Sequence, residues 1–430
     1  MARRRKFKSR AKAPSPAKTA EAEIMEIGAR GDGVAFIEGE KVFTPYSAPG
    51  DVARITYRGG RGEIECLSAE SPHRSAAPCR YFGHCGGCAL QHLSVDYYRD
   101  WKRKLVVDAL AREGFSEEII APLHACPPAS RRRAAFAVRR TASGVVFGFN
   151  ERGASRIVAI DHCLVLAPQL SEAISPLRAL AGAAPSRWRA FDLQVTLCDN
   201  GLDVAFTGGD ASDDLTGPEI MALTEAAQAA GIVRLTADGA PVAMFETPVV
   251  RFGGVPVAVP PGGFLQASAE GEAALLSFVL EHTKDAKRVA DLFSGCGTFA
   301  LPLAAGAAVD AFDSDAPAIA ALDTASRGAG LRFPLRAERR NLFERPLSVE
   351  ELNPYNAVVF DPPRAGARAQ AETLAQSSVP IVVGVSCNPA SFARDASILR
   401  AGGYSLSQLL PVDQFVFSAH VELAGLFTKE

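Results

Sequence analysis

Apolar runs that end in polar or glycine residues recur through the second half of the chain. In 289–303 a short apolar run breaks into Ser-Gly-Cys-Gly and then resumes with helical character. Later apolar runs end at Asp313, at Asp361 and at Cys387. Short apolar runs suit buried strands, and strands that alternate with helices form a doubly wound sheet. Such a sheet binds its ligand outside the carboxyl ends of its strands, so we expect a site among these polar residues.

The first part of the chain has a different pattern, in which short strand-like runs are separated by glycines. Five such runs span 23–27, 33–36, 41–45, 51–57 and 63–68. Their number, length and spacing predict a small five-stranded barrel of the OB type, a shape that is common among RNA-binding domains.

Aromatic and aliphatic residues at helical spacing then predict a helix over 90–114. A β-rich stretch follows and runs to about residue 258. It opens with Arg131, Arg132 and Arg133, which form either a phosphate clamp or a solvated strand edge. A further apolar helix is predicted over 270–282, shortly before the glycine turn.

Charge is nearly balanced overall but is concentrated at the start of the chain. The net charge of −2 over 430 residues does not indicate a general nucleic-acid binder. Residues 1–18 nevertheless contain eight basic residues and no acid. We therefore expect a disordered basic tail over 1–20, which either attracts RNA phosphates or only keeps the protein soluble.

No apolar run approaches the roughly 18 residues that a membrane-spanning helix needs. No apolar signal segment follows the basic tail either. From these features we expect no membrane association, a cytoplasmic location and, by default, a monomer.

The chain has nine cysteines, an odd number, and they are unevenly spread. Cys79, Cys85 and Cys88 fall within ten residues, and Cys163 is the candidate for a fourth ligand, with Cys66 as a competitor. In a cytoplasmic protein such a set indicates a metal rather than disulfides. Four thiolates suit either a zinc ion or a four-iron cluster. The single remote cysteine favours the cluster, because zinc ribbons normally use two close pairs.

Two later motifs carry candidate chemistry. The sequence Asp361-Pro-Pro-Arg ends one apolar run, and its prolines hold the turn stiff, so that the aspartate projects at the sheet edge. The sequence Ser-Cys387-Asn-Pro ends the next run and places a thiol at the same edge. A thiol in this position is a candidate nucleophile, whereas a lone cysteine is more often an inert core residue.

A nucleophilic thiol allows methylation of a weakly nucleophilic carbon. When a thiolate adds to carbon 6 of uracil, electron density moves to carbon 5, which can then attack the methyl group of a sulfonium donor. A base must afterwards remove the proton from carbon 5, so that the thiol can leave. Glu422, in the final His-Val-Glu, is the candidate base; by itself it also fits an ordinary surface acid.

Together these motifs resemble the RNA 5-methyluridine methyltransferases, specifically the 23S rRNA branch with a TRAM domain and a 4Fe-4S cluster. The resemblance covers nearly the whole chain from about residue 21. It implies an α/β protein with a class I (Rossmann-like) methyltransferase domain, an N-terminal OB-type β-barrel (TRAM) and a β-rich central domain. The implied division is a tail over 1–20, the barrel over 21–75, the central domain over 76–92 and 126–258, and the methyltransferase domain over 93–125 and 259–430.

The same resemblance implies the roles of individual residues. It makes Cys79, Cys85, Cys88 and Cys163 the ligands of the 4Fe-4S cluster. It gives contacts to S-adenosylmethionine to Gln266, Phe293, Thr298, Asp313, Asn341 and Asp361. It makes Cys387 the nucleophile, Glu422 the base and Asp361 an orienting and electrostatic group.

Four positions depart from the family pattern. The family usually has a cysteine at Ser294 and a glutamate at Asp313, and it often has an asparagine at Thr298 and at Ser268. These differences concern the fit of the donor and the substrate more than the type of reaction.

The predicted activity is methyl transfer from S-adenosylmethionine to carbon 5 of a specific uridine in 23S rRNA, through a covalent adduct with cysteine. The alternatives are the same reaction on tRNA, methylation of an exocyclic base amine, and a non-catalytic RNA-binding role in ribosome assembly. Arg364 stands where amine methyltransferases have an aromatic residue, and an intact Cys387 argues for catalysis. The sequence does not identify the uridine.

Overall fold

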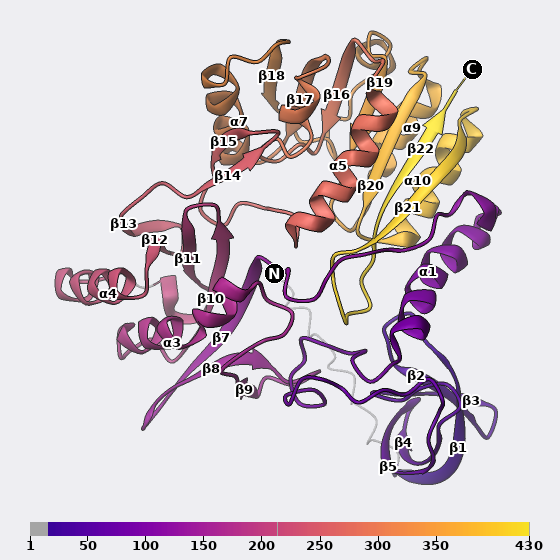
Figure 1. The fold of residues 1–430 in the computed structure, drawn as a ribbon, viewed down its shortest axis with the longest axis vertical. Coiled ribbons are helices and arrows are strands. Elements are labelled where there is room, and N and C mark those ends of the chain that lie inside the picture. Colours follow the sequence, from indigo (N-terminus) through magenta and orange to yellow (C-terminus); the bar gives the residue numbers. More distant parts are fainter. Residues whose placement is uncertain (1–15, 213, 430) are drawn as a thin grey trace, which may run out of the picture. The chain divides into compact units, whose positions relative to one another are not determined.

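The computed structural model describes residues 16–212 and 214–429 (Figure 1). They form two compact units, one made of 16–77 with Ala89–Tyr97 and the other of Pro78–Cys88 with 98–429. Most of the predicted basic tail falls on residues 1–15 and lies outside the described residues. The first strand already begins at Lys18, inside the segment predicted as tail.

The first unit contains the predicted barrel. Its strands are β1 (Lys18–Ile27), β2 (Gly33–Ile37), β3 (Glu40–Thr44), β4 (Val52–Arg58) and β5 (Arg61–Ala69). They close in the order β1-β2-β3-β5-β4. Side chains alternate between the two faces of each strand, so that Ile24, Ala35, Val42 and Ile55 fill the interior. The prediction of a five-stranded barrel is confirmed, and its form is consistent with an OB-type domain.

The following helix, α1 (Val95–Arg112), is shorter than predicted. Residues 90–94 are not helical, because they pack on the barrel instead. Leu90 is fully buried beside Gly31, and Nε2 of His92 lies 2.9 Å from the backbone oxygen of Ser47. The prediction of a helix from residue 90 is therefore wrong at its start.

The central part of the second unit is a seven-stranded sheet in the order β13-β12-β11-β10-β7-β8-β9. Its strands are β7 (Arg133–Thr141), β8 (Gly144–Asn150), β9 (Ile157–Ala159), β10 (Ala190–Cys198), β11 (Gly201–Thr207), β12 (Ile232–Ala237) and β13 (Ala240–Met244). The helices α2 (Pro168–Glu172), α3 (Ile174–Ala183) and α4 (Gly217–Ala229) and the short turns Glu117–Ile119 and Gly209–Ser212 complete this region and its approaches. Leu177 and Leu223 share a buried cluster with Phe136 and Phe206 of the sheet. The β-rich character is confirmed, but the sequence analysis does not predict these helices.

The C-terminal part of the second unit is an eight-stranded sheet in the order β18-β17-β16-β19-β20-β22-β21-β6 (Figure 1). Its strands are β6 (His124–Ala125), β16 (Arg288–Leu292), β17 (Ala308–Asp313), β18 (Leu335–Arg339), β19 (Ala357–Phe360), β20 (Ile381–Ser386), β21 (Ser405–Asp413) and β22 (Glu422–Thr428). A separate hairpin, β14 (Val249–Phe252) and β15 (Val255–Ala258), precedes them.

The first five strands of this sheet are parallel, and β22 pairs antiparallel with both β20 and β21. The chain passes from β16 to β17 and β18 on one side and then returns to β19 on the other side of β16. The carboxyl ends of β16 and β19 are therefore a topological switch point, the place at which a doubly wound sheet binds its ligand.

Helices cover both faces of this sheet, which explains the uninterrupted apolar runs in its strands. The helices are α5 (Ala269–Thr283), α6 (Ala300–Leu303), α7 (Ala316–Gly328), α8 (Val349–Leu352), α9 (Arg368–Gln376) and α10 (Pro389–Ala401). Val359 and Val383 face α5, α6 and α7, whereas Val358 and Val382 face α1, α9 and α10. The predicted doubly wound methyltransferase-type fold is confirmed. Within the described residues, no helix is both long and apolar enough to span a bilayer.

We predict that Gly148→Ala destabilises the central sheet. The added Cβ would lie 1.9 Å from the backbone oxygen of Val158 on the paired strand, so β8 and β9 must separate. The free energy of unfolding should fall by about 2–3 kcal/mol, as in other overpacked sites. The measurement is urea denaturation followed by circular dichroism.

Gly182→Ala is the matched control. Gly182 lies in α3, is exposed, and has no atom within 4 Å of the new Cβ. Alanine in place of a helical glycine should raise stability by about 0.5–1 kcal/mol. Equal stability of the two variants would contradict the prediction.

Candidate active site

The turn after β16 places backbone that a ligand can approach closely at the switch point. Phe293, Gly295 and Gly297 have φ angles of 62°, 53° and 97°. A side chain at Gly297 would place its Cβ 2.4 Å from Cδ1 of Leu322, so the turn can pack on α7 only with glycine there. At Gly295 nothing lies within 4 Å of that position. The turn therefore packs tightly on one side and leaves room for a ligand on the other.

Asp313 ties this turn to the next strand. At the end of β17, its Oδ2 accepts a hydrogen bond of 2.9 Å from the N–H of Gly295, and its Oδ1 accepts one of 2.8 Å from the N–H of Asp315. The carboxylate is half-buried, and each oxygen has a second lone pair for a ligand hydroxyl. Asp313 is therefore placed both to order the turn and to bind a ligand.

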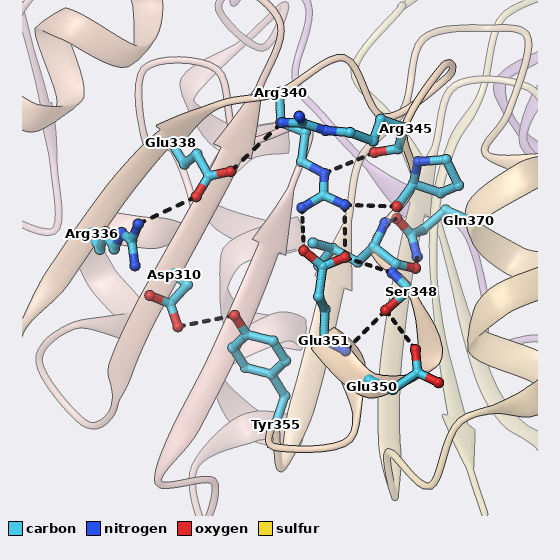
Figure 2. Close-up of polar contacts among 12 residues, drawn as sticks. Asp310, Arg336, Glu338, Arg340, Arg345, Ser348, Glu350, Glu351, Tyr355 and Gln370 are labelled. Atoms are coloured by element: carbon cyan, nitrogen blue, oxygen red, sulfur yellow. Dashed lines mark hydrogen bonds and ion pairs between the residues drawn. The ribbon is translucent and has the colours of Figure 1, made fainter.

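Figure 2 shows how the loop after β18 is fixed. The guanidinium of Arg340 is buried and donates to both carboxylate oxygens of Glu351, at 2.6 and 2.7 Å. It also donates to two backbone carbonyls of the loop at 2.8 Å. Such a two-pronged ion pair fixes geometry as well as charge. The fixed loop carries Asn341, which is half-buried, with its Oδ1 3.1 Å from the N–H of Phe343.

Two aromatic side chains lie between this loop and the glycine turn. The rings of Phe293 and Phe343 are 5.4 Å apart, and Phe343 is 49% exposed. Thr298 is half-buried at the far end of the turn. An exposed aromatic surface beside a polar edge suits a ligand with a flat ring and a polar tail.

Asp291 is enclosed beneath the turn. It is fully buried, and neither carboxylate oxygen makes a hydrogen bond within the part of the chain that the structure describes. Burial raises the pKa of this carboxyl well above its usual range, and the nearby Asp361 and Asp313 raise it further. An unpaired buried acid of this kind marks a functional site more often than a structural one.

A chain of four side chains joins the ends of β19 and β22. Nε2 of Gln266 donates to Asp361 at 2.9 Å. Nε2 of Gln414 donates to Oε1 of Gln266 and to Oε2 of Glu422, both at 2.8 Å. Oε1 of Gln414 in turn accepts the N–H of Ala267 at 3.0 Å. The two glutamines thus fix both acids without neutralising either.

The environment of these two acids opposes their ionisation. Glu422 is 3% exposed, and Asp361, although partly accessible from the site, is closely surrounded by protein. Desolvation raises the pKa of both carboxyls, and the negative charge of Asp361 raises that of Glu422 further. Both carboxyls therefore bind a proton nearer neutral pH than exposed acids do, which suits proton transfer.

Cys387 lies beside this pair. It follows β20 and is half-buried. Burial, followed by the charges of Glu422 and Asp361, raises the pKa of its thiol to about 11, and Arg364 opposes that rise. The thiol, the two acids and a guanidinium therefore share one small region at the switch point.

Local hydrogen bonds hold the two motif turns together. The side chain of Asn388 caps α10 by accepting the N–H of Ala390 at 3.1 Å, and it donates to the backbone oxygen of Arg364 at 2.9 Å. A nitrogen of the Arg364 guanidinium lies 3.2 Å from Nδ1 of His420. The Cys-Asn-Pro turn and the Asp-Pro-Pro-Arg turn consequently form one rigid edge.

The three consecutive arginines do not form a solvated strand edge. Arg132 is buried, donates to the backbone oxygen of Gln266 at 2.9 Å and pairs with Glu272 at 2.5 Å. Arg133 donates to the backbone oxygen of Leu265 at 3.0 Å. That alternative is therefore wrong, because these side chains hold the segment that carries Gln266. A phosphate clamp stays a prediction.

The four predicted metal ligands come from two segments of the chain, and none of them is in a disulfide. Cys79 and Cys163 each raise the pKa of the Cys85 thiol after burial, and Cys88 and Cys163 both influence Arg131. Within residues 16–212 and 214–429, however, no three histidine, cysteine or acidic side chains are close enough to hold a metal ion. A cluster would require the thiols to approach one another further.

The structure thus brings together Gln266, Asp361, Cys387 and Glu422, and it places Phe293, Thr298, Asp313 and Asn341 along the adjacent turns. It also adds two residues that the sequence analysis does not assign to the site. Gln414 gave no signal, because its partners Gln266 and Ala267 lie 148 and 147 residues away in sequence. Asp291 was visible as the acid of the glycine turn, and only its complete burial singles it out.

Comparison with known proteins gives closely related chains. A sequence profile described as tRNA (Uracil-5-)-methyltransferase matches residues 336–430. An RNA methyltransferase of Brucella suis is 45% identical over 96% of this chain and 98% of its own length. A 23S rRNA (uracil(1939)-C(5))-methyltransferase of Chromohalobacter salexigens is 32% identical over 95% of this chain and 89% of its own length.

Among solved structures, the fold is similar to that of a Pyrococcus abyssi tRNA (uracil-54, C5)-methyltransferase in complex with S-adenosyl-L-homocysteine. The TM-score is 0.71, with 24% identity, and the match covers 95% of this chain and 99% of the other. At this identity the likeness concerns the fold.

We predict that Glu422→Gln is more stable than the wild type at high pH. The pKa of Glu422 is raised in the folded state above the value of about 4.3 in an unfolded chain. Between these values the folded state binds more protons, so raising the pH destabilises it. Glutamine avoids this loss. In urea denaturation the stability difference should grow in favour of the variant from about pH 5 to about pH 8, by on the order of 2 kcal/mol.

Glu225→Gln, on the exposed side of α4, controls for simple loss of charge and should show no such trend. A Glu422→Gln variant whose difference from the wild type does not change with pH would show that the carboxyl is not perturbed.

Proposed function

We propose that this chain, which belongs to the tRNA and rRNA uracil-5-methyltransferase family, methylates carbon 5 of a uridine in 23S rRNA through a covalent adduct on Cys387. It is an RNA methyltransferase that uses S-adenosylmethionine. The observation that carries the proposal is the convergence of one thiol, two perturbed acids and a fixing glutamine at the switch point.

The proposed reaction begins when the Cys387 thiol loses its proton to solvent and the resulting thiolate attacks carbon 6 of a uracil that has been flipped out of the RNA. The new S–C6 bond pushes the C5–C6 electrons into an enolate. Carbon 5 then takes the methyl group from the sulfonium, whose C–S bond breaks to leave S-adenosylhomocysteine. Methyl transfer to carbon 5 therefore needs no external electron donor.

Glu422 completes the proposed cycle. It removes the remaining proton from carbon 5, the C5–H electrons restore the double bond to carbon 6, and the C6–S bond breaks to return the thiolate. A carboxyl with a raised pKa is a stronger base than an exposed one, because its charged form is destabilised before it accepts the proton. Gln414 holds the carboxyl in place for this step.

Because the pKa of the thiol is raised, removing the thiol proton costs free energy before Cys387 can attack. With both acids beside it, Cys387 is a thiol rather than a thiolate in the free protein. Arg364 offsets part of this effect and also lies at the site, where it can stabilise the developing negative charge. Asp361, fixed by Gln266, is the proposed orienting acid.

The methyl donor, S-adenosylmethionine, is proposed to bind on the side of the switch point formed by the glycine turn. The glycine turn leaves space at Gly295, Asp313 presents a half-buried carboxylate, and Phe293 and Phe343 offer an aromatic surface. Phe293, Thr298, Asp313 and Asn341 are the proposed contacts here, and Gln266 and Asp361 are the proposed contacts near the methyl group. A positive sulfonium or amino group bound nearby would lower the raised pKa of the enclosed Asp291 and favour its ionised form.

The choice of 23S rRNA over tRNA depends on the relatives. The relative named for 23S rRNA matches almost the whole chain at 32% identity, whereas the tRNA enzyme of known structure shares the fold at 24%. The barrel, with the OB-type form common in RNA binding, fits either substrate. Ribosomal RNA is therefore the substrate proposed.

The central prediction concerns 5-fluorouridine. Fluorine on carbon 5 cannot be removed as a proton, so the adduct should persist on a denaturing gel. We expect a donor-dependent shifted band with fluorouridine-substituted 23S rRNA fragments, and none with Cys387→Ala. Glu422→Gln should still give the band, because the base acts only after methyl transfer.

Cys198→Ala is the matched control for loss of a thiol, since Cys198 is buried in β10 of the central sheet and is not among the proposed site residues. A band with tRNA fragments alone would move the activity to tRNA. RNA binding without any band would instead favour an assembly role or amine methylation.

We also propose that Cys79, Cys85, Cys88 and Cys163 bind a 4Fe-4S cluster. The support is chemical: four thiols from two segments are outside any disulfide, Cys79, Cys85 and Cys163 influence one another, and Cys88 shares the neighbour Arg131 with Cys163. Its role would be structural, because four protein thiolates leave no iron open to substrate.

If these four cysteines bind a 4Fe-4S cluster, protein purified without oxygen should be brown and contain about four iron atoms per chain. Cys85→Ser should lose the colour and the iron, and RNA binding should weaken. Cys66→Ser, at an exposed cysteine, is the control and should keep both. Stoichiometric zinc in place of iron, or no metal in anaerobic protein, would refute the cluster.

A further inference from the structure

A fully buried lysine holds the loop that leads to Glu422. Lys102, on α1, has a side chain with 0% exposure. Its Nζ donates to Oδ1 of Asp413 at 2.5 Å, to the backbone oxygen of Phe415 at 3.0 Å and to that of His420 at 2.5 Å. An ammonium group has three donors, and all three are used on residues 413–420.

Tyr98, one turn earlier on α1, completes the arrangement. Its hydroxyl donates to Oδ2 of Asp413 at 2.5 Å and accepts the N–H of Phe417 at 2.9 Å. Both oxygens of the buried Asp413 are thereby paired. Phe417 has a φ of 60°, an unfavourable conformation for a side chain of this size, so the loop is held in a shape it would not adopt freely.

This loop is the connection between β21 and β22, and both of its ends reach the active site. At its start, Gln414 follows Asp413 directly and hydrogen-bonds to Glu422 and Gln266. At its end, Glu422 comes two residues after His420, whose carbonyl Lys102 binds. We call Lys102, Tyr98 and Asp413 the latch.

Cys387 is held by different contacts. It lies between β20 and α10, where the side chain of Asn388 caps the helix and the hydroxyl of Ser386 bonds to the Asn388 backbone N–H at 3.2 Å. The Asn388 side chain also donates to the backbone oxygen of Arg364 at 2.9 Å, which ties this turn to the Asp-Pro-Pro-Arg turn. None of the latch residues takes part in these hydrogen bonds.

We propose that Lys102 and Tyr98 are positioning residues that act on proton removal by Glu422 and not on attack by Cys387. The proposal rests on the proposed function. The latch fixes the base through its loop, while the nucleophile is fixed locally. Loosening the latch should therefore slow the second half of the reaction, after the methyl group has been transferred.

The test uses the full-length protein, ordinary uridine-containing RNA and S-adenosylmethionine. Two variants are used, Tyr98→Phe, which keeps the ring, and the double variant Lys102→Met/Asp413→Asn, which removes both buried charges and so avoids leaving one unpaired. Turnover should fall by about tenfold or more, since small displacements of a catalytic group have large effects.

Formation of the adduct in a single turnover should change less than about threefold. The methylated RNA–protein adduct should consequently accumulate on a denaturing gel, as it should with Glu422→Gln, whereas the wild type should release its product. A parallel fall in turnover and adduct formation, or unchanged turnover, would overturn the proposal.

The matched control removes another buried ion pair from the same unit. Arg234 and Asp203 of the central sheet are bonded at 2.7 and 2.8 Å and are both buried. Arg234→Met/Asp203→Asn should lower the melting temperature without causing the adduct to accumulate. Accumulation in this control would mean that general destabilisation, not the latch, explains the result.

A second measurement, of stability against pH, tests the latch without measuring catalysis. In the latch variants, the pH-dependent stability difference that Glu422→Gln produces should shrink, because the carboxyl is no longer held in its enclosed place. An undiminished difference would overturn the latch. Absence of a fluorouridine adduct in the wild type would instead overturn the proposed function, and the two failures are thus distinguishable.

Discussion

The active site depends on keeping two acids close together in an enclosed place. Asp361 and Glu422 are surrounded by protein, and each loses favourable hydration when charged. Coulomb repulsion between them is strong where water is scarce. Left alone, the two carboxyls would move apart or toward solvent. Much of the surrounding structure can be understood as preventing that movement.

Neutral amides carry out the fixing. Gln266 and Gln414 donate to one acid each, and Gln414 also donates to Gln266. A lysine or arginine in these places would neutralise an acid and lower its pKa, which would spoil a base. Amides fix position with only a small effect on charge. Two further positive groups act one layer out: Arg132 holds the Gln266 backbone, and Lys102 holds the loop after Gln414.

Local patterns in the sequence were sufficient to predict the barrel strands, the strands that end at Asp313, Asp361 and Cys387, and these turn residues. Asp361, Cys387 and Asp313 each follow an apolar run, and parallel strands bring their carboxyl ends to one edge. Gln414 and Lys102 were beyond such reasoning, because their partners lie 148 and 311 residues away and no periodicity marks them. The arginines 131–133 were visible, but their partners were not.

The remaining errors have the same cause. Residues 90–94 have helical spacing, yet the barrel takes up Leu90 and His92 and α1 starts later. Apolar spacing indicates that a side chain will be buried, but it does not identify the element on which that side chain packs. Tertiary packing therefore overrides propensity where a segment has a second place to bury its apolar residues.

The nucleophile and the base reach the site by different routes. Cys387 is set by a strand, an Asn-capped helix and the turn between them, all within a few residues. Glu422 is set by an ammonium and a phenol from α1, more than 310 residues earlier. The thiol turn can form as soon as its strand pairs, whereas the base is fixed only when α1 has docked on the completed sheet. In the proposed mechanism, adduct formation without a base would trap the enzyme on its RNA, so correct docking of α1 would allow the proposed reaction to finish.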